Sequence, residues 1–190
     1  MTSYGKAALG VAAALALGAG QANAAPCSAT PIPIASFSTC DVGDLQFAPI
    51  SSTLPTGATI AISAANPFSI SVAIGFGGGF FPVGSQSISY SVTSLGGGVN
   101  GVQLDSLAVG LAQVTKQLTP GGTLSTVGFA TVSQSLPWLT SFTVTDSYTV
   151  GQGQLLFGFT NTYFIPEPGS IALFAAGLAG LGLMRRRRAA

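Results

Sequence analysis

Apolar and polar residues alternate over several short stretches in the middle of the chain. The clearest are 68–76, 87–92, 142–145 and 155–159, in which Phe, Ile, Val, Tyr or Leu recur at every second position and the residues between are mostly small or polar. Successive side chains of a strand point to opposite faces of a sheet, so this pattern predicts strands with one buried face. Clusters of Gly, Asn and Pro separate the stretches and predict turns.

Further strands are predicted near residues 44–50, 58–64, 101–110 and 123–132, and only 111–118 is expected to make one or two helical turns. About eight short strands at this spacing predict an all-β fold, an antiparallel β-sandwich of jelly-roll or immunoglobulin-like type. The sequence has no repeat of fixed period, which argues against a solenoid.

The N-terminal segment has the form of a signal peptide. Lys6 supplies a positive charge, residues 7–19 are apolar, and Ala22-Asn23-Ala24 is a small-x-small cleavage site. We therefore expect residues 1–24 to be removed and Ala25 to become the first residue.

The C-terminal segment has three parts in a fixed order. A Pro-Glu-Pro hinge comes first, then an uncharged apolar segment at 171–184, then a basic cluster that consists of Arg185, Arg186, Arg187 and Arg188. As a helix the apolar segment spans roughly 21 Å, less than the bilayer core of about 30 Å. The arginines stop translocation and stay in the cytoplasm. Physics alone fits an ordinary transmembrane anchor as well as a sorting signal.

This ordered combination resembles the PEP-CTERM sorting signal of Gram-negative bacteria, over residues 166–190. In that family the tail is recognised by an exosortase, a membrane transpeptidase that removes it near the motif. The resemblance implies that Pro166, Glu167 and Pro168 are recognition residues of a substrate. It also implies export through the inner membrane to the outer surface or extracellular matrix, in a system linked to exopolysaccharide.

Between these ends, residues 25–165 are expected to form one domain of nearly neutral surface. Lys116 is the one positive residue against four aspartates, which gives a formal charge of −3, and the region has no histidine or arginine. Nucleic-acid binding needs clustered basic residues and is excluded. Cys27 and Cys40 are predicted to form a disulfide, because paired cysteines of exported proteins are usually oxidised.

A second resemblance covers the body. Cys40, the Gly-Asp-Leu-Gln-Phe run at 43–47, the Ile-Ser-Tyr-Ser-Val run at 88–92 and the Val-Thr-Asp run at 144–146 are similar to a recurrent group of exported PEP-CTERM proteins. That resemblance implies a single β-domain without a settled activity.

Candidate catalytic and metal-binding residues are few. Without histidine there is no imidazole base or zinc ligand, and no cofactor, metal site or enzyme activity is predicted. Strict alternation places Asp146 on the apolar side of its strand, where an unpaired carboxylate is costly. It is then either an acid with a perturbed pKa or a calcium ligand. The favoured interpretation is that a bulge turns the side chain outward. Asp41 and Asp44 are weak calcium candidates, and a turn explains Asp44 more simply. Lys116 is expected to be solvated.

Two aromatic features are candidate contacts for a ligand. Trp138 stacks on a sugar if it is exposed, although a buried or interface position is favoured for a lone tryptophan. Residues 76–81 form either an adhesive loop or a hairpin with its phenylalanines tucked back. Two functions follow: a non-catalytic surface or matrix protein, or a carbohydrate-binding or adhesive module that uses Trp138 or the loop.

Overall fold

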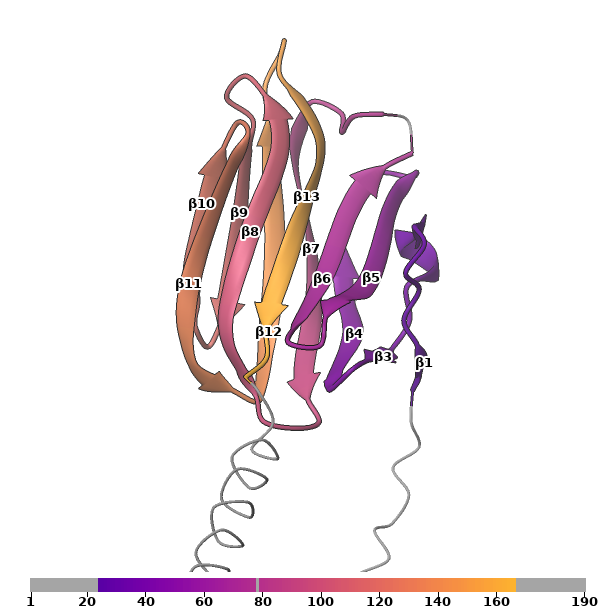
Figure 1. Cartoon of the computed structure of the whole chain (residues 1–190). Coiled ribbons are helices and arrows are strands. Elements are labelled where there is room, and N and C mark those ends of the chain that lie inside the picture. The colour runs from indigo at the N-terminus through magenta and orange to yellow at the C-terminus, as the bar shows by residue number, and fades with distance from the viewer. Residues whose placement is uncertain (1–23, 78, 167–190) are drawn as a thin grey trace, which may run out of the picture.

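The computed structural model describes residues 24–77 and 79–166, which form two β-sheets packed face to face (Figure 1). Apart from Ala24, the predicted signal peptide lies outside the described residues. So do Glu167, Pro168, the apolar segment and the four arginines.

The two sheets contain seven and six strands of the described chain. The seven-stranded sheet has the order β1 (Ala25–Pro26), β3 (Cys40–Val42), β4 (Leu45–Ser52), β7 (Gly84–Ser94), β12 (Ser141–Val150), β9 (Gln113–Thr119) and β10 (Gly122–Val127). The six-stranded sheet has the order β11 (Ala130–Leu139), β8 (Val99–Val109), β13 (Leu155–Phe164), β6 (Ser69–Phe76), β5 (Ala58–Asn66) and β2 (Ile32–Pro33). A short 3₁₀ helix, Ile34–Ser36, follows β2.

The strand pairing is that of a jelly roll. Strand β6 pairs with β13, β7 with β12, β8 with β11 and β9 with β10, all antiparallel. Successive pairs lie alternately in the two sheets, as in a long hairpin rolled into a sandwich. The predicted all-β sandwich is confirmed, and of the two predicted topologies the pairing selects the jelly roll.

Alternation along the strands builds the core between the sheets. In β12 every second residue, from Phe142 to Val150, is buried, and in β7 Ile88, Tyr90 and Val92 are buried in the same way. Strand β13 of the opposite sheet contributes Leu156 before a bulge and, by a similar alternation after it, Phe159, Asn161 and Tyr163. The polar residues between them face solvent on the two outer surfaces.

Two sequence-based expectations about secondary structure are wrong. The segment 111–118, expected to be helical, contains most of β9, which pairs with β10 and β12. The segment 123–132, expected to be one strand, is divided between β10 and β11 by a turn at Gly128, whose φ of 67° suits glycine. The strands expected near 44–50, 58–64 and 101–110 are present.

Both ends of the described body lie at the same end of the sandwich, the lower end in Figure 1. Strand β13 runs down the middle of its sheet between β8 and β6, and its last hydrogen bond beyond the strand joins Ile165 N–H to Phe68 O at 2.8 Å. Residues 24–77 and 79–166 include no helix that is long and apolar enough to cross a membrane.

Candidate functional site

The C-terminal motif begins where the core ends. Ile165 is 8% exposed and packs with the core, and Pro166 is the last residue described. Cleavage near Pro166 would therefore remove no residue of β13.

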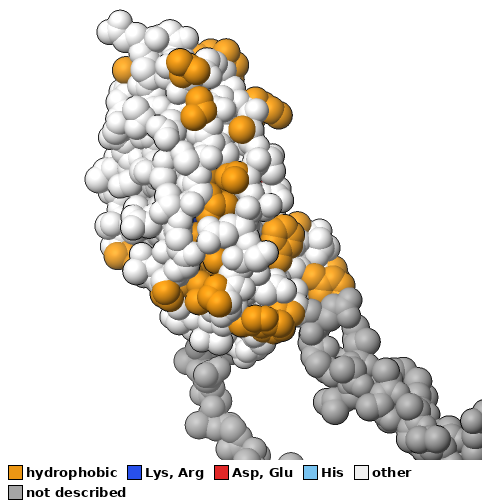
Figure 2. Space-filling view, turned by 90° about the vertical axis from the view of Figure 1, so that its left-hand side faces the viewer, with side chains coloured by type: hydrophobic (Ala, Val, Ile, Leu, Met, Phe, Trp, Pro, Cys, Tyr) orange, Lys and Arg blue, Asp and Glu red, His pale blue; other side chains and the backbone are white. Residues whose placement is uncertain are grey.

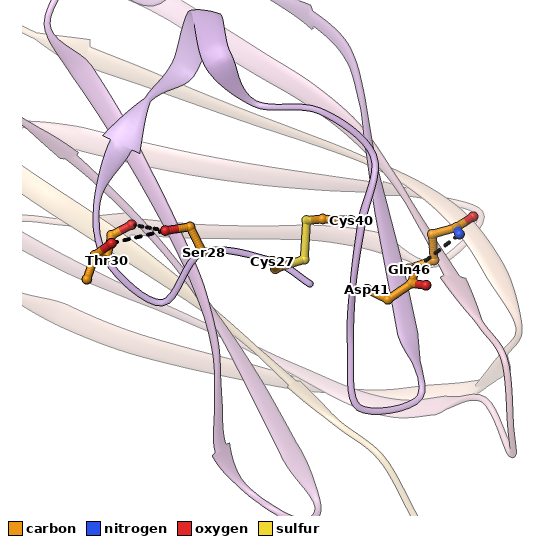
Figure 3. Close-up of a disulfide and its surroundings, with 6 residues drawn as sticks. All are labelled: Cys27, Ser28, Thr30, Cys40, Asp41 and Gln46. Carbon is orange, nitrogen blue, oxygen red and sulfur yellow. Dashed lines mark hydrogen bonds between the residues drawn. A yellow bond between two sulfur atoms is a disulfide. The ribbon is translucent and has the colours of Figure 1, made fainter. Parts of the chain in front are cut away.

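The predicted disulfide between Cys27 and Cys40 is present (Figure 3). The two Cα atoms lie 4.8 Å apart, and Cys27 N–H donates to Asp41 O at 2.9 Å beside the parallel pairing of β1 with β3. Ser28 Oγ–H donates to Thr30 O at 2.7 Å, which tightens the turn after the bridge. The disulfide thus fastens the N-terminal segment to the edge of the seven-stranded sheet.

Asp41 makes a structural contact through its carboxylate, and Asp44 makes one through its main chain. Asp41 Oδ1 accepts a hydrogen bond from Gln46 Nε2 at 3.1 Å, and the main-chain oxygen of Asp44 accepts one from Leu95 N–H at 2.7 Å. Among the residues with described positions, no group of three or more His, Cys, Asp or Glu side chains is placed to hold a metal ion. Calcium binding by Asp41 or Asp44, which the sequence supports only weakly, stays untested.

Trp138 is on the surface of the body, which makes a core position wrong, whereas an interface position stays a prediction. Its side chain is 59% exposed, and its φ of 49° lies in the left-handed region that bulky residues rarely adopt. It lies within a bulge in β11, where the register shifts between Ser135 and Leu139. Leu139 pairs with Val99 near the start of β8, so Trp138 lies at the same end of the sandwich as the C-terminal motif.

The aromatic loop at 76–81 lies at the opposite end of the sandwich, where β6 ends and β13 begins. Phe81 is buried, with its ring centroid 4.8 Å from that of Tyr148 and 5.7 Å from that of Phe76. Phe80 is 49% exposed. The loop is therefore partly tucked back, and it does not share a contact surface with Trp138.

Other exposed apolar residues lie around strands β8 to β11. Figure 2 shows this side of the molecule, where apolar side chains form several separate groups among polar atoms. Phe129 is 79% exposed, and it lines a groove of about 370 Å³ on the outer face of the six-stranded sheet together with Leu107, Asp105 and Thr131. No pattern in the sequence predicts this groove, because its lining comes from strands far apart in the chain.

Five polar side chains meet in the core between the sheets, and all are fully buried: Tyr90, Lys116, Asp146, Asn161 and Tyr163. Lys116 Nζ lies 3.3 Å from Asp146 Oδ1 and donates to Tyr163 OH at 3.1 Å. Tyr90 OH donates to Asp146 Oδ2 at 3.0 Å and lies 2.8 Å from Tyr163 OH. Asn161 Nδ2 donates to Asp146 Oδ2 and to Tyr90 OH.

Burial sets the ionisation of this cluster. It lowers the pKa of Lys116 to about 8, although the Asp146 carboxylate acts in the opposite direction. Burial, and then the charge of Asp146, raise the pKa of Tyr90 and of Tyr163 well above the ordinary value of tyrosine. Both phenols therefore stay protonated at physiological pH.

The structure corrects two predictions about charged residues. Lys116, expected to be solvated, is 0% exposed, and Asp146, expected to turn outward at a bulge, keeps its alternation and points into the core. The two residues are paired directly across β9 and β12. Val114 and Leu118 flank Lys116 at buried positions, so the alternation along β9 was the signal that could have placed it.

Comparison with known proteins identifies the C-terminal segment. Residues 164–188 match the family model of the PEP-CTERM protein-sorting motif, as the sequence analysis predicted, so the chain carries this sorting motif. No curated protein matches the chain. A motif of this kind indicates a protein that is exported and sorted in Gram-negative bacteria.

Two solved structures show low similarity. One is TmCBM61 in complex with β-1,4-galactotriose, at 10% identity and a TM-score of 0.33, covering 62% of this chain and 86% of that chain. The other is the Podospora anserina GH26-CBM35 β-(1,4)-mannanase, at 16% identity and a TM-score of 0.33, covering 67% of this chain and 29% of that chain. The jelly roll described above rests on the strand pairing of this chain itself.

Proposed function

We propose that this protein is a non-catalytic component of the cell surface or extracellular matrix, delivered by an exosortase-type membrane transpeptidase in a system linked to exopolysaccharide. The observation that carries this proposal is the PEP-CTERM motif at 164–188, which begins at Phe164, the final residue of the last strand of a folded domain. The division into a signal peptide at 1–24, a body at 25–165 and a sorting signal at 166–190 is part of the proposal.

The buried position of the body's ionisable cluster supports a non-catalytic role. Lys116 and Asp146 are 0% exposed, so neither reaches a substrate in solution. General acid–base catalysis needs a group within hydrogen-bond reach of the substrate.

The test is the mass of the mature protein from a host with and without the exosortase. We expect a chain that ends near Pro166 in the first strain and one that retains Arg185 to Arg188 in the second. A Glu167→Ala variant should retain the arginines in both strains, whereas the matched variant Pro137→Ala should be processed normally. An unchanged mass that includes the arginines in both strains would replace this proposal with a plain membrane anchor.

A second candidate function is carbohydrate binding or adhesion through Trp138. The exposed indole and its strained backbone favour it, since strain of this kind is often retained at binding sites. We expect polysaccharide pull-down with the host's own exopolysaccharide to be lost in Trp138→Ala and kept in Phe129→Ala, an exposed aromatic elsewhere on the surface. Equal binding by both variants would exclude Trp138 as the contact.

A further inference from the structure

The buried cluster brings together an amine, a carboxylate and a carboxamide. Asp146 contacts both of the others: Lys116 Nζ lies 3.3 Å from its Oδ1, and Asn161 Nδ2 donates to its Oδ2. Lys116 is the one lysine of residues 25–165, and all three side chains are 0% exposed. One carboxylate thus bridges a nucleophile and an acyl group at a site closed to bulk solvent.

An ordinary ion pair does not account for this arrangement. Taking two charges out of water costs several kcal/mol per ion, and apolar residues of similar volume commonly stabilise a core at least as well. Asn161 Oδ1 is buried and accepts no hydrogen bond from any described residue. An unpaired buried oxygen lowers the free energy of unfolding further. The cluster is therefore expensive as a purely structural device.

We propose that Lys116 and Asn161 become joined by an intramolecular isopeptide bond between Nζ and Cγ, with Asp146 as the catalytic group that carries the protons. The bond would link β9 of the seven-stranded sheet to β13 of the six-stranded sheet.

The reaction balances without a cofactor. Asp146 accepts a proton from the Lys116 ammonium, and the neutral amine attacks Asn161 Cγ to form a new C–N bond. A second proton passes from Nζ to Nδ2 by way of the Asp146 carboxyl group, and the bond from Cγ to Nδ2 breaks. Ammonia leaves, the product is a secondary amide, and Asp146 retains the first proton.

The surroundings favour each of these steps. Burial, which lowers the pKa of Lys116 to about 8, favours the neutral amine that acts as nucleophile. Asn161 Oδ1 is free to accept a hydrogen bond from protonated Asp146 as negative charge develops on it. The hydroxyl groups of Tyr90 and Tyr163 lie beside the reacting nitrogens, at 2.9 Å from Asn161 Nδ2 and 3.1 Å from Lys116 Nζ.

The experiment is a peptide map of the full-length protein purified from an exporting host. The protein is denatured, reduced, treated with an amine-reactive reagent and cut with chymotrypsin. We expect one branched peptide that contains Lys116 and Asn161, lighter than the sum of its two arms by one ammonia, with Lys116 unlabelled. Separate arms at unmodified masses with Lys116 labelled would overturn the proposal. Loss of ammonia at Asn161 with Lys116 labelled would overturn it too, because that result is a succinimide.

Variants identify the groups that take part. Lys116→Arg keeps the charge but should give no branched peptide, and Asp146→Asn should give none although both reacting side chains remain. Asp105→Asn, which changes a carboxylate on the outer face of β8, should give the branched peptide at the wild-type yield. A branched peptide at wild-type yield in Asp146→Asn would overturn the role of Asp146. If a core variant fails to fold, the wild-type map alone still decides whether the bond exists.

Discussion

Removing the disulfide between Cys27 and Cys40 should lower the free energy of unfolding, by an amount that depends on the length of the loop that the disulfide closes. The two cysteines are 13 residues apart. In the chain-entropy model a cross-link over a loop of this length raises the free energy of unfolding by about 3 kcal/mol, because it restricts the unfolded chain. For a body of about 140 residues, that loss corresponds to a fall in Tm of about 10 °C.

The folded-state contacts near the bridge add a local effect. The loop between the cysteines contains β2, the 3₁₀ helix and Phe37, which is 8% exposed and packs against the core. Without the bridge, short backbone connections hold this segment: the two-residue pairings of β1 with β3 and of β2 with β5, and single hydrogen bonds at Cys27 and Ser28. We therefore expect amide exchange to speed up first in residues 25–42 and to stay slow in β7 and β12.

The assay is thermal unfolding of the wild-type protein and of the double variant Cys27→Ser/Cys40→Ser, each with and without reductant. The double variant and the reduced wild type should melt at the same lower temperature, and reductant should leave the double variant unchanged. A double variant that melts within about 2 °C of the oxidised wild type would refute the reasoning, since the cross-link would then not stabilise the fold by restricting the unfolded chain.

Three further predictions concern the core and the surface. In Asn161→Leu, which keeps Lys116 as a free amine, the free energy of unfolding should rise from about pH 8 towards pH 10, because the unfolded lysine holds its proton up to its ordinary pKa of 10.5 while the folded one has released it. It should fall above pH 10, where tyrosines ionise in the unfolded chain but Tyr90 and Tyr163 do not in the fold. Urea unfolding measures both slopes, and a flat profile between about pH 8 and pH 10 would mean that burial does not lower the pKa of Lys116. In Gly158→Ala the new Cβ meets Ile74 O at 2.9 Å, so urea unfolding should show a loss of about 1–3 kcal/mol, against less than about 0.5 kcal/mol for Gly97→Ala, whose Cβ meets nothing within 4 Å. Trp138→Gly should not lower the Tm, because it relieves a φ of 49° and removes a mostly exposed side chain; a loss above about 1 kcal/mol would mean that the indole packs on the body.

The parts of the fold that the sequence predicts are those governed by alternation. Strands β6, β7 and β12 follow their apolar periodicity, and the number and spacing of the predicted strands were enough to predict a sandwich. The helical turns expected at 111–118 fail for a specific reason. Lys116 was counted as an outward-facing polar residue, which breaks the alternation of β9, whereas in the core it continues the inward series of Val114 and Leu118.

The candidate site was less predictable, because its contacts join distant parts of the chain. Asp146 meets Lys116 from the neighbouring strand and Asn161 from the opposite sheet, and no local pattern reports either contact. The position of Trp138 depends on a bulge in β11, which shifts the register after Ser135. Pro137 is a local mark of such a bulge, because proline cannot donate to strand pairing, but it does not show where the next side chain points. The PEP-CTERM motif was predictable because its recognition depends on residue order near the C-terminus and needs no folded partner.

The place of β13 in its sheet has a mechanical consequence. The strand that leads to the sorting motif lies between β8 and β6 and is antiparallel to both. A pull on the C-terminal end is therefore directed along a central strand, so that its hydrogen bonds to both neighbours are loaded in shear and resist together. An edge strand pulled across its length would instead open one bond at a time. Any attachment through this end would place tension on a strand that is supported on both sides.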